Sequence, residues 1–470
     1  MTASTTAAFD QLKRAFPDKV VTPDAVSEYN TAVSCPWSQT CWTPAAGYVY
    51  LSNAQELAEA LDIVKRVGSK FTIRTTGHNP NSGFSSADHT AIVLDIRQFQ
   101  SKELSSDGVA RVGSGNTWGE VYVWLEEKKL SAIGGRDQQV GLGGFLLGGG
   151  MGALPNLYGL GADGVKNFEI LLADGRLVNA NATENTDLYC ALKGGGSNFG
   201  IVTRFDLETH PLIRVQYTIN LYNPEDYVEI IKATIAVQEA MENDPKIGLF
   251  TNFNNGFVAV GLLYGDTPTE KPPVFEPFHR LESLMATALP STDGTLLSLA
   301  QAMGHAQEPK KRAICSVTTK VSQSLYEEAY KSWNETCKRL PAGCVLHYTI
   351  QPMGKAGIKA GKDRGENIMG LEDVPQCWWV FTCEWPKDDS DDAVAQKAVD
   401  TMAKSVEHSA KEKGLWLSFQ CMSFAGASQK VLGSYGADNV NRMQETAAKY
   451  DPEGVFQKLQ YGGFLLRDNI

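Results

Sequence analysis

The sequence predicts a protein of the α+β class, and three observations lead to that prediction. The chain has 470 residues, enough for two or three units that each bury a core. Strands and helices alternate at close spacing over residues 1–212, a pattern typical of a mixed α+β domain. From residue 213 to 427 the pattern changes to amphipathic helices alternating with strands, which favours an antiparallel sheet backed by helices.

The composition is that of an ordinary globular protein, and it excludes several classes of function. A formal net charge of −11 argues against a surface for nucleic acid or for an anionic membrane. No apolar run approaches the ~20 residues that span a bilayer, and the first residues lack the apolar centre of a secretory signal. We therefore expect a cytoplasmic protein with no membrane partner. The oligomeric state is left open.

Cysteine and histidine usage gives no sign of a metal site. The nine cysteines are scattered and form no C-x-x-C pair, and the histidines outside the motifs below show no ligand spacing. We expect no metal ion and no dense disulfide framework.

In the first region, the clearest helix is expected between a cap at Ser52 and Gly68. Apolar side chains recur there at helical spacing, Ser52 and Gln55 form the pattern of a capping box, and Gly68 ends the helix. The other expected elements are strands over 71–74, 91–96 and 109–113, a helix over 117–129, a hairpin over 168–180 that turns at Asp174-Gly175, a helix over 187–193 and a strand over 199–207. His210-Pro211 marks the exit into the second region.

The second region is expected to contain three helices and seven strands. The helices are predicted over 224–242, 274–289 and 324–339, and the strands over 217–221, 247–253, 258–264, 315–321, 345–351, 378–384 and 415–423. Such a sheet could roof a pocket formed by the first region.

Three glycine-rich stretches carry the chemistry of the first region. In FTIRTTGHNPNSG, residues 71–83, His78 stands at the tip of a small-residue loop that can approach a ligand closely. In VGLGGFLLGGGMG, residues 140–152, the spacing G-x-G-x-x-G is absent and no apolar strand leads into the run, so a Rossmann site is rejected. A loop whose N–H groups line an anionic ligand fits better, with close packing as the alternative.

These stretches, with DLYCALKGGGSNFGIVTRF at 187–205 and YDPEGVFQKLQYGGF at 450–464, resemble one known family. It is the berberine-bridge-enzyme-like branch of the vanillyl-alcohol-oxidase flavoproteins, which share the PCMH-type FAD-binding domain, and in particular its fungal secondary-metabolite oxidases. The resemblance covers roughly residues 21–212 and 428–466. It implies a two-part FAD-binding domain, residues 1–212 completed by 428–470, with a substrate domain at 213–427.

The resemblance also implies how FAD is held. In the motif R-x-x-G-H, the histidine carries FAD covalently through the flavin 8α-methyl carbon, and here that residue is His78. Asn439 fits the family pattern Y-x-x-x-N-x-x-R and is expected near the flavin ring. The full set of cofactor-binding residues that we expect is Arg74, Thr75, Thr76, Gly77, His78, Asn79, Ser82, Gly83, Gln138, Val140, Gly141, Gly144, Gly148, Gly149, Gly152, Gly196, Asn198, Gly200, Ile201, Val202 and Asn439.

The chain departs from the family pattern at four positions. Asp137 stands where some members have a cysteine bonded to flavin C6, so a single covalent attachment is implied. Phe145 replaces a histidine of the plant members. Phe424 and Val380 stand where relatives have a tyrosine or a glutamate base.

Another base must therefore be sought. Alternation over residues 346–351 puts His347, Thr349 and Gln351 on one face of a strand. His347 is the first candidate because imidazole titrates near neutral pH, and Asp137 is the second. Gln351 could hold a water molecule. That His347 is only a sheet residue touching solvent is equally open.

The function that these inferences favour is a covalent-FAD oxidase of a small, fairly apolar secondary metabolite, with O₂ as acceptor. Hydride would leave an activated C–H of an alcohol, allylic, benzylic or amine group, and ring closure of the product is an option. The missing bases fit a substrate that is acidic itself. A flavin dehydrogenase with another acceptor, or a non-redox cyclase with structural FAD, are the alternatives.

Overall fold

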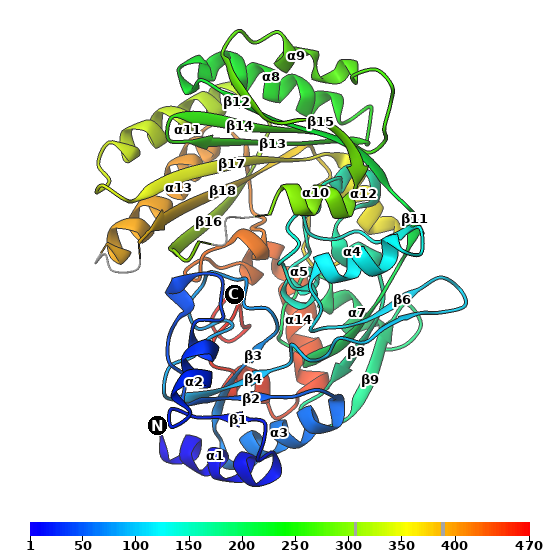
Figure 1. Ribbon diagram of the computed structural model, residues 1–470, viewed down its shortest axis with the longest axis vertical. Helices are drawn as coiled ribbons and strands as arrows, with labels where there is room; N and C mark the ends of the chain where they lie inside the picture. Colours follow the sequence, from blue (N-terminus) through cyan, green and yellow to red (C-terminus); the bar gives the residue numbers. More distant parts are fainter. Residues whose placement is uncertain (305–307, 387–390) are drawn as a thin grey trace.

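The structure is a computed structural model that describes residues 1–304, 308–386 and 391–470. Figure 1 shows two small sheets in the lower part and one large sheet with its helices in the upper part. The strand orders are β1-β2-β4-β3, β5-β6-β10-β8-β9 and β15-β12-β14-β13-β17-β18-β16-β19, with β7 and β11 as a separate pair. The predicted α+β class is confirmed.

The first lower sheet is built around parallel strands β2, β4 and β3, with helices on its flanks. Its elements are α1 (Ala3–Ala15), β1 (Val20–Val21), α2 (Val26–Val33), β2 (Gly47–Tyr50), α3 (Ala54–Val67), β3 (Lys70–Arg74) and β4 (Ala91–Asp95). The predicted cap of α3 is wrong by one residue. Asn53 is the N-cap and accepts from the N–H of Glu56, while Ser52 bonds to the Glu56 carboxylate instead.

The second lower sheet is antiparallel. Its strands are β5 (Lys102–Leu104), β6 (Ala110–Gly113), β8 (Val165–Leu171), β9 (Leu177–Asn181) and β10 (Ile201–Leu207), accompanied by α4 (Trp118–Glu126), α5 (Leu142–Leu147), α6 (Pro155–Tyr158) and α7 (Thr186–Leu192). The predicted hairpin is confirmed as β8 and β9, and Gly175 at its turn has a φ of 86°. At the exit, β11 (His210–Pro211) pairs with β7 (Leu130–Ser131).

The eight-stranded sheet is antiparallel, as predicted. Its strands are β12 (Arg214–Tyr222), β13 (Ile247–Asn254), β14 (Phe257–Tyr264), β15 (Leu284–Thr295), β16 (Lys311–Lys320), β17 (Val345–Met353), β18 (Gln376–Trp385) and β19 (Trp416–Leu417). The helices of this part are α8 (Tyr227–Ala240), α9 (Glu276–His279), α10 (Leu296–Ala302), α11 (Gln323–Cys337), α12 (Lys355–Asp363) and α13 (Asp392–Glu412). Helices α8, α11 and α13 cover the face of the sheet that is turned away from the lower part (Figure 1).

Three predictions for this region are corrected. The helix predicted over 274–289 is only α9, and the chain continues as strand β15, because edge pairing with β12 outweighs the helical spacing. The strand predicted over 415–423 ends at Leu417, since the chain then turns down toward the lower part. Helix α13 is absent from the predicted elements, although its buried residues recur at helical spacing.

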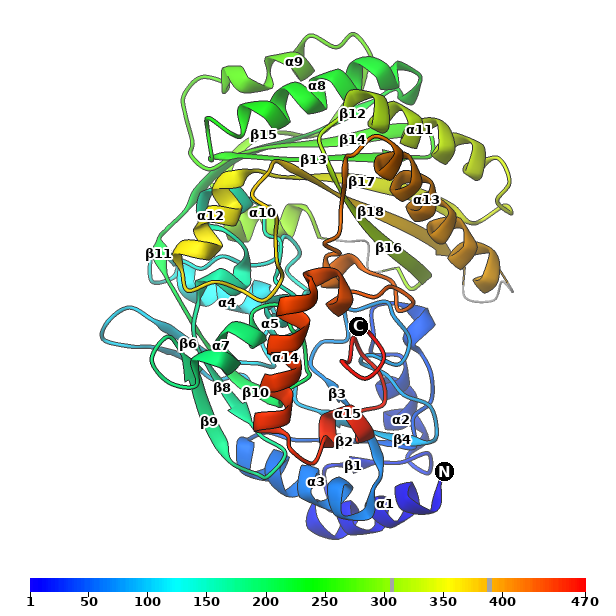
Figure 2. The same ribbon diagram turned by 180° about the vertical axis from the view of Figure 1, so that it is seen from behind.

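The end of the chain returns to the lower part, as Figure 2 shows for α14 (Ala437–Tyr450) and α15 (Val455–Leu459). The N–H of Tyr461 donates to the carbonyl of Phe71 on β3 at 2.7 Å. The Asn198 amide donates to the carbonyl of Phe464 at 2.9 Å and accepts from the N–H of Leu466 at 2.9 Å. The last residues are therefore fastened to two motif-bearing segments of the first region.

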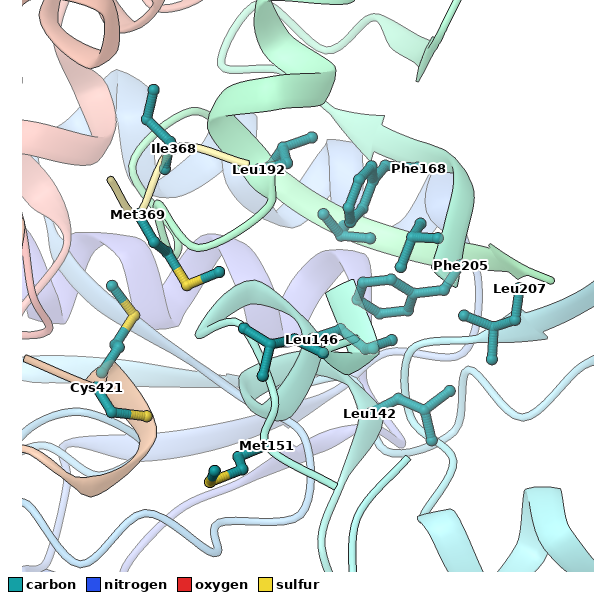
Figure 3. Close-up of a cluster of buried hydrophobic side chains, with 14 of the residues drawn as sticks. Leu142, Leu146, Met151, Phe168, Leu192, Phe205, Leu207, Ile368, Met369 and Cys421 are labelled. Carbon is teal, nitrogen blue, oxygen red and sulfur yellow. The ribbon is translucent and has the colours of Figure 1, made fainter. Parts of the chain in front are cut away.

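One hydrophobic core joins the segments around the glycine-rich helix α5. In Figure 3, Leu142 and Leu146 of that helix lie near Phe205, while Met369 and Cys421 come from distant parts of the chain. All five side chains belong to the same buried cluster. Burial of such large apolar side chains contributes about 1.5–3 kcal/mol each, so this cluster fixes the position of the loops at its border.

Within the described ranges, the helices are too short or too polar for a membrane-spanning segment.

Candidate active site

A cavity of about 630 Å³ lies where the loops of the lower part meet the open face of the eight-stranded sheet. Its lower wall is formed by some of the residues in each of four segments, 75–80, 135–145, 196–202 and 460–464. Its upper wall is formed by side chains from β13, β14, β16, β17 and β18. The two regions that the sequence distinguishes thus share one cavity.

Most of the predicted cofactor-binding residues line this cavity. They are Thr75, Thr76, Gly77, His78, Asn79, Val140, Gly141, Gly144, Gly196, Gly200, Ile201 and Val202. The residues placed outside the wall are Arg74, Ser82, Gly83, Gln138, Gly148, Gly149, Gly152, Asn198 and Asn439.

Three of the residues outside the wall make hydrogen bonds or ion pairs that stabilise the fold. Arg74 is buried and pairs with Asp95 at 2.8 Å, which anchors the start of the His78 loop to β4. Asn198 fastens the chain end, as described above. Asn439, in the first turn of helix α14, donates to the carbonyl of Tyr435, which precedes that helix, at 3.0 Å.

The glycines of the wall have different reasons to be glycine. A Cβ at Gly141 would lie 2.6 Å from Oγ1 of Thr76, so this position is explained by close packing. Gly77 and Gly196 have φ values of 75° and 66°, in the left-handed region. A Cβ at Gly144 would meet no atom within 4 Å, so this glycine borders open space.

Four buried polar side-chain atoms at the cavity have no partner among the residues that the structure describes. They are Oγ of Ser85, Oγ of Ser114, Oγ of Ser423 and Oε1 of Gln460. A buried polar atom without a hydrogen bond costs about 1–3 kcal/mol, so these groups call for a polar ligand. Three hydroxyls, which can donate or accept, and one amide oxygen, which accepts, stand here among glycines, and this set fits a phosphate- and ribityl-bearing cofactor such as FAD.

His78 is held in a stack of side chains from three segments. Its ring lies parallel to the ring of Trp37, with centroids 4.6 Å apart and 8° between the planes. The Arg312 guanidinium lies 3.8 Å from the centroid of the Trp37 ring and pairs with Glu384 at 2.7 Å. The N–H of Trp37 donates to the carbonyl of Gly77, so this backbone is tied to the loop as well. The stack fixes the plane of the His78 imidazole.

Strand β17 presents the predicted face to the cavity. His347, Thr349 and Gln351 all line the cavity, while Tyr348 and Ile350 between them are buried in the core beneath the helices. Register with β13 and β18 fixes this alternation.

The His347 ring is oriented by Asn252 of β13. Nδ2 of Asn252 lies 3.1 Å from Nδ1 of His347 and donates to Oγ1 of Thr349 at 2.8 Å. When the amide nitrogen faces His347 in this way, Nδ1 accepts, and the neutral ring carries its proton on Nε2. A proton acceptor at Nε2 requires Asn252 to present its oxygen to Nδ1 instead.

The carboxylates at the cavity are both engaged. Asp137 is 2% exposed, and its Oδ1 accepts from the N–H of Gln139 at 2.8 Å. Glu384 is held by Arg312. Val380 and Phe424, the positions of the missing family bases, both line the cavity.

Arg136 is the most unusual charged group in the wall. Its Nη2 donates to Oε1 of Gln351, which connects the lower loop to β17. Burial lowers the pKa of Arg136 from its ordinary value to about 10. Sequence reasoning missed Arg136, Trp37, Arg312 and Glu384 as cavity residues, because no local pattern marks them.

The geometry is that of a flavin-dependent oxidoreductase: a glycine-lined cavity with a fixed histidine, roofed by a sheet. A family model described as an FAD binding domain matches residues 45–181. An FAD-dependent monooxygenase of Arthrobotrys oligospora is 37% identical over 443 residues, which cover 93% of this chain and 86% of that protein.

Solved structures show the same fold. The BBE-like 1 protein of Physcomitrella patens has a TM-score of 0.80 at 18% identity, covering 97% of this chain and 99% of that one. Glucooligosaccharide oxidase from Acremonium strictum, described with a 6-S-cysteinyl, 8α-N1-histidyl FAD, has a TM-score of 0.81 at 18% identity, covering 95% and 97%.

The chain belongs to the family of FAD-dependent oxidoreductases of secondary metabolism that includes this Arthrobotrys relative. It is an FAD-linked enzyme with the berberine-bridge-enzyme-like fold, as the motifs predict.

Proposed function

We propose that this protein is an oxidase with FAD covalently attached through the 8α carbon to His78, acting on a small secondary metabolite. The observation that carries the proposal is the single cavity that brings His78 together with the His347, Thr349 and Gln351 face of β17. Bound FAD would take a hydride from the substrate and return the electrons to O₂, giving H₂O₂.

The covalent bond to His78 is supported by the stack with Trp37 and Arg312, which holds one imidazole plane at the cavity wall. The Acremonium oxidase supplies the parallel of an 8α-histidyl FAD. Asp137 offers no thiolate, so one covalent bond is proposed rather than two. The proposed cofactor set comprises the lining residues given above together with Ser85, Ser114, Ser423 and Gln460.

The substrate is proposed to lie against β17 and β18. Phe250, Ile314, Val380 and Phe424 make much of that side apolar, which fits a fairly apolar metabolite. His347 is proposed to accept the substrate proton, with Asn252 turned to accept from Nδ1. Gln351 is proposed to hold the substrate or a water molecule.

The test is anaerobic mixing of the purified, yellow protein with candidate metabolites, followed by admission of air. Three results together support an oxidase. The visible absorbance of the oxidised flavin is lost on mixing, it recovers quickly in air, and one H₂O₂ forms per turnover. Slow recovery that an added electron acceptor accelerates would show a dehydrogenase. Turnover under argon with the flavin still oxidised would show a cyclase.

A monooxygenase is a second candidate, because the Arthrobotrys relative carries that name. Turnover under ¹⁸O₂ separates the two. An oxidase leaves the label in H₂O₂, whereas a monooxygenase puts one labelled atom into the product and the other into water. Mass analysis of the same product reports whether a ring has closed.

A further inference from the structure

Arg136 places a positive charge in the cavity wall, and few hydrogen-bond acceptors around it balance that charge. A guanidinium has five N–H donors, and within the described part of the chain only Oε1 of Gln351 accepts from it. No carboxylate of those residues lies at ion-pairing distance from Arg136. Its neighbour Asp137 is turned to the N–H of Gln139, and Glu384 is held by Arg312.

The position of Arg136 in the cavity wall also affects the pKa of its guanidinium. Partial burial in the cavity wall lowers the pKa of Arg136 to about 10, so the guanidinium remains charged at neutral pH. A guanidinium in a cavity wall with no carboxylate partner favours an anionic ligand, which would supply the missing counter-charge.

We propose that Arg136, steadied by Gln351, binds a planar oxyanion of the substrate, that is, a carboxylate, phenolate or enolate. The proposal rests on the oxidase function proposed above and names its substrate class. Guanidinium donors form a flat fork that matches two oxygens, or one oxygen and its neighbour, in a plane.

The contact with Gln351 places this fork toward the substrate side of the cavity. Gln351 shares the β17 face with His347 and Thr349, and its own side chain is only 4% exposed. The fork is therefore aimed at the sheet that roofs the cavity. The loop that contains Arg136 supplies the charge, and Gln351 of strand β17 orients the guanidinium.

The same proposal explains the apolar side chains at the usual base positions. Val380 and Phe424 cannot take a proton. A substrate that enters as a phenolate or enolate has already lost to solvent the proton that its oxidation would otherwise release, and Arg136 would stabilise it in that state. A carboxylate substrate would still pass its hydroxyl proton to His347. Oxidation would then need no base at those two positions.

The test uses the full-length, FAD-loaded protein and two probes of equal shape, benzoate and benzamide. Isothermal titration calorimetry measures both without turnover, so an inactive protein can still be tested. We expect benzoate to bind at least about tenfold more tightly than benzamide to the natural protein. In Arg136→Met, benzoate should lose about 10- to 100-fold in affinity, with little change for benzamide.

Gln351→Glu is the second variant, because it places a carboxylate beside Arg136 at almost unchanged volume. It should remove benzoate binding and leave benzamide binding within about threefold. Arg66→Met is the matched control, since Arg66 is exposed and pairs with Asp62 on helix α3.

Three outcomes would overturn the inference. The first two are equal affinities for the two probes and unchanged benzoate binding in Arg136→Met. The third is loss of FAD from Arg136→Met while Arg66→Met retains FAD, which would assign Arg136 to the cofactor. A natural protein that prefers benzoate through Arg136 yet fails to reduce its flavin with any metabolite would contradict the oxidase function while keeping the anion site.

Discussion

His78 is the residue on which the proposed chemistry depends most directly. The proposed bond to the flavin gives a simple expectation, namely that the natural protein retains FAD through acid denaturation and shows a fluorescent band on a denaturing gel under ultraviolet light. His78→Ala should lose that band while the folded protein retains dissociable FAD in the cavity. A yellow, fully loaded natural protein whose denatured band is dark would refute covalent attachment.

Trp37 acts on His78 through its ring face, so its effect should be on the rate of attachment rather than on FAD binding. The parallel contact at 4.6 Å leaves the imidazole one plane, and Trp37→Ala removes that constraint. We expect covalent incorporation to slow by about 10- to 100-fold when FAD is added to flavin-free protein, since misorientation of a reacting group has costs of this size.

The time course of the fluorescent gel band measures this rate, and bound FAD is measured separately by absorbance. Trp37→Phe keeps a stacking ring and should recover most of the rate. Equal rates in Trp37→Ala and the natural protein would show that the stack has no part in the attachment.

His347 is the residue proposed to take the substrate proton. His347→Ala should slow anaerobic flavin reduction by about 10²–10⁴-fold and remove the limb of the pH profile near pH 6–7. Thr382→Val is the control at the neighbouring cavity position on β18 and should stay within a few-fold. If His347→Ala also stays within a few-fold, His347 leaves the mechanism, and an already ionised substrate held by Arg136 becomes the explanation.

At the scale of elements, the short pair of β7 and β11 contains a half-buried histidine whose Nε2 atom is shielded from solvent. The His210 ring lies 4.2 Å from the ring of Tyr158, and its Nε2 has no partner among the residues described. Burial lowers the pKa of His210 below its ordinary value, with Arg364 and Lys166 acting in the same direction and Glu208 opposing. The folded state therefore takes up this proton at lower pH than the unfolded state.

The sign of the stability effect follows from that difference. As the pH falls through 6.5, the unfolded chain binds a proton that the folded chain does not, so the free energy of unfolding decreases. One proton contributes at most about 1.4 kcal/mol per pH unit. His210→Phe should make urea unfolding less steeply pH-dependent between pH 7 and 5 than it is in the natural protein. An unchanged slope in His210→Phe would contradict the prediction.

The elements also show why prediction from sequence succeeds in some places and fails in others. The face of β17 was predictable because alternation with period two fixes which side chains lie together once the strand is central. Strand β15 was not, because its side chains are mostly exposed at a sheet edge and its pairing with β12 is set by distant residues. The stack of Trp37, His78 and Arg312 joins three segments far apart in sequence, and no local pattern encodes it.

At the scale of the whole molecule, the cavity depends on both ends of the sequence. Phe464 and Gln460 from the chain end line it, and the bonds of Tyr461 to Phe71 and of Phe464 to Asn198 hold that end in place. These contacts support the proposed domain division, in which residues 428–470 complete the domain formed by 1–212. Sequence motifs predicted that the end of the chain returns to the first domain. They did not show which residues bind it there.

The division predicts that removal of residues 450–470 abolishes both FAD retention and solubility, because the cut exposes the core beside β3 and opens the cavity wall. Since such a truncation could fail simply by misfolding, Asn198→Ala is the sharper variant. It removes the four side-chain hydrogen bonds of Asn198, which join Gly195, Gln457, Phe464 and Leu466, while the whole chain remains. We expect circular dichroism like that of the natural protein, with at least about tenfold less FAD bound, a loss that these hydrogen bonds can account for. Soluble, yellow protein lacking residues 450–470 would contradict the two-part FAD-binding domain.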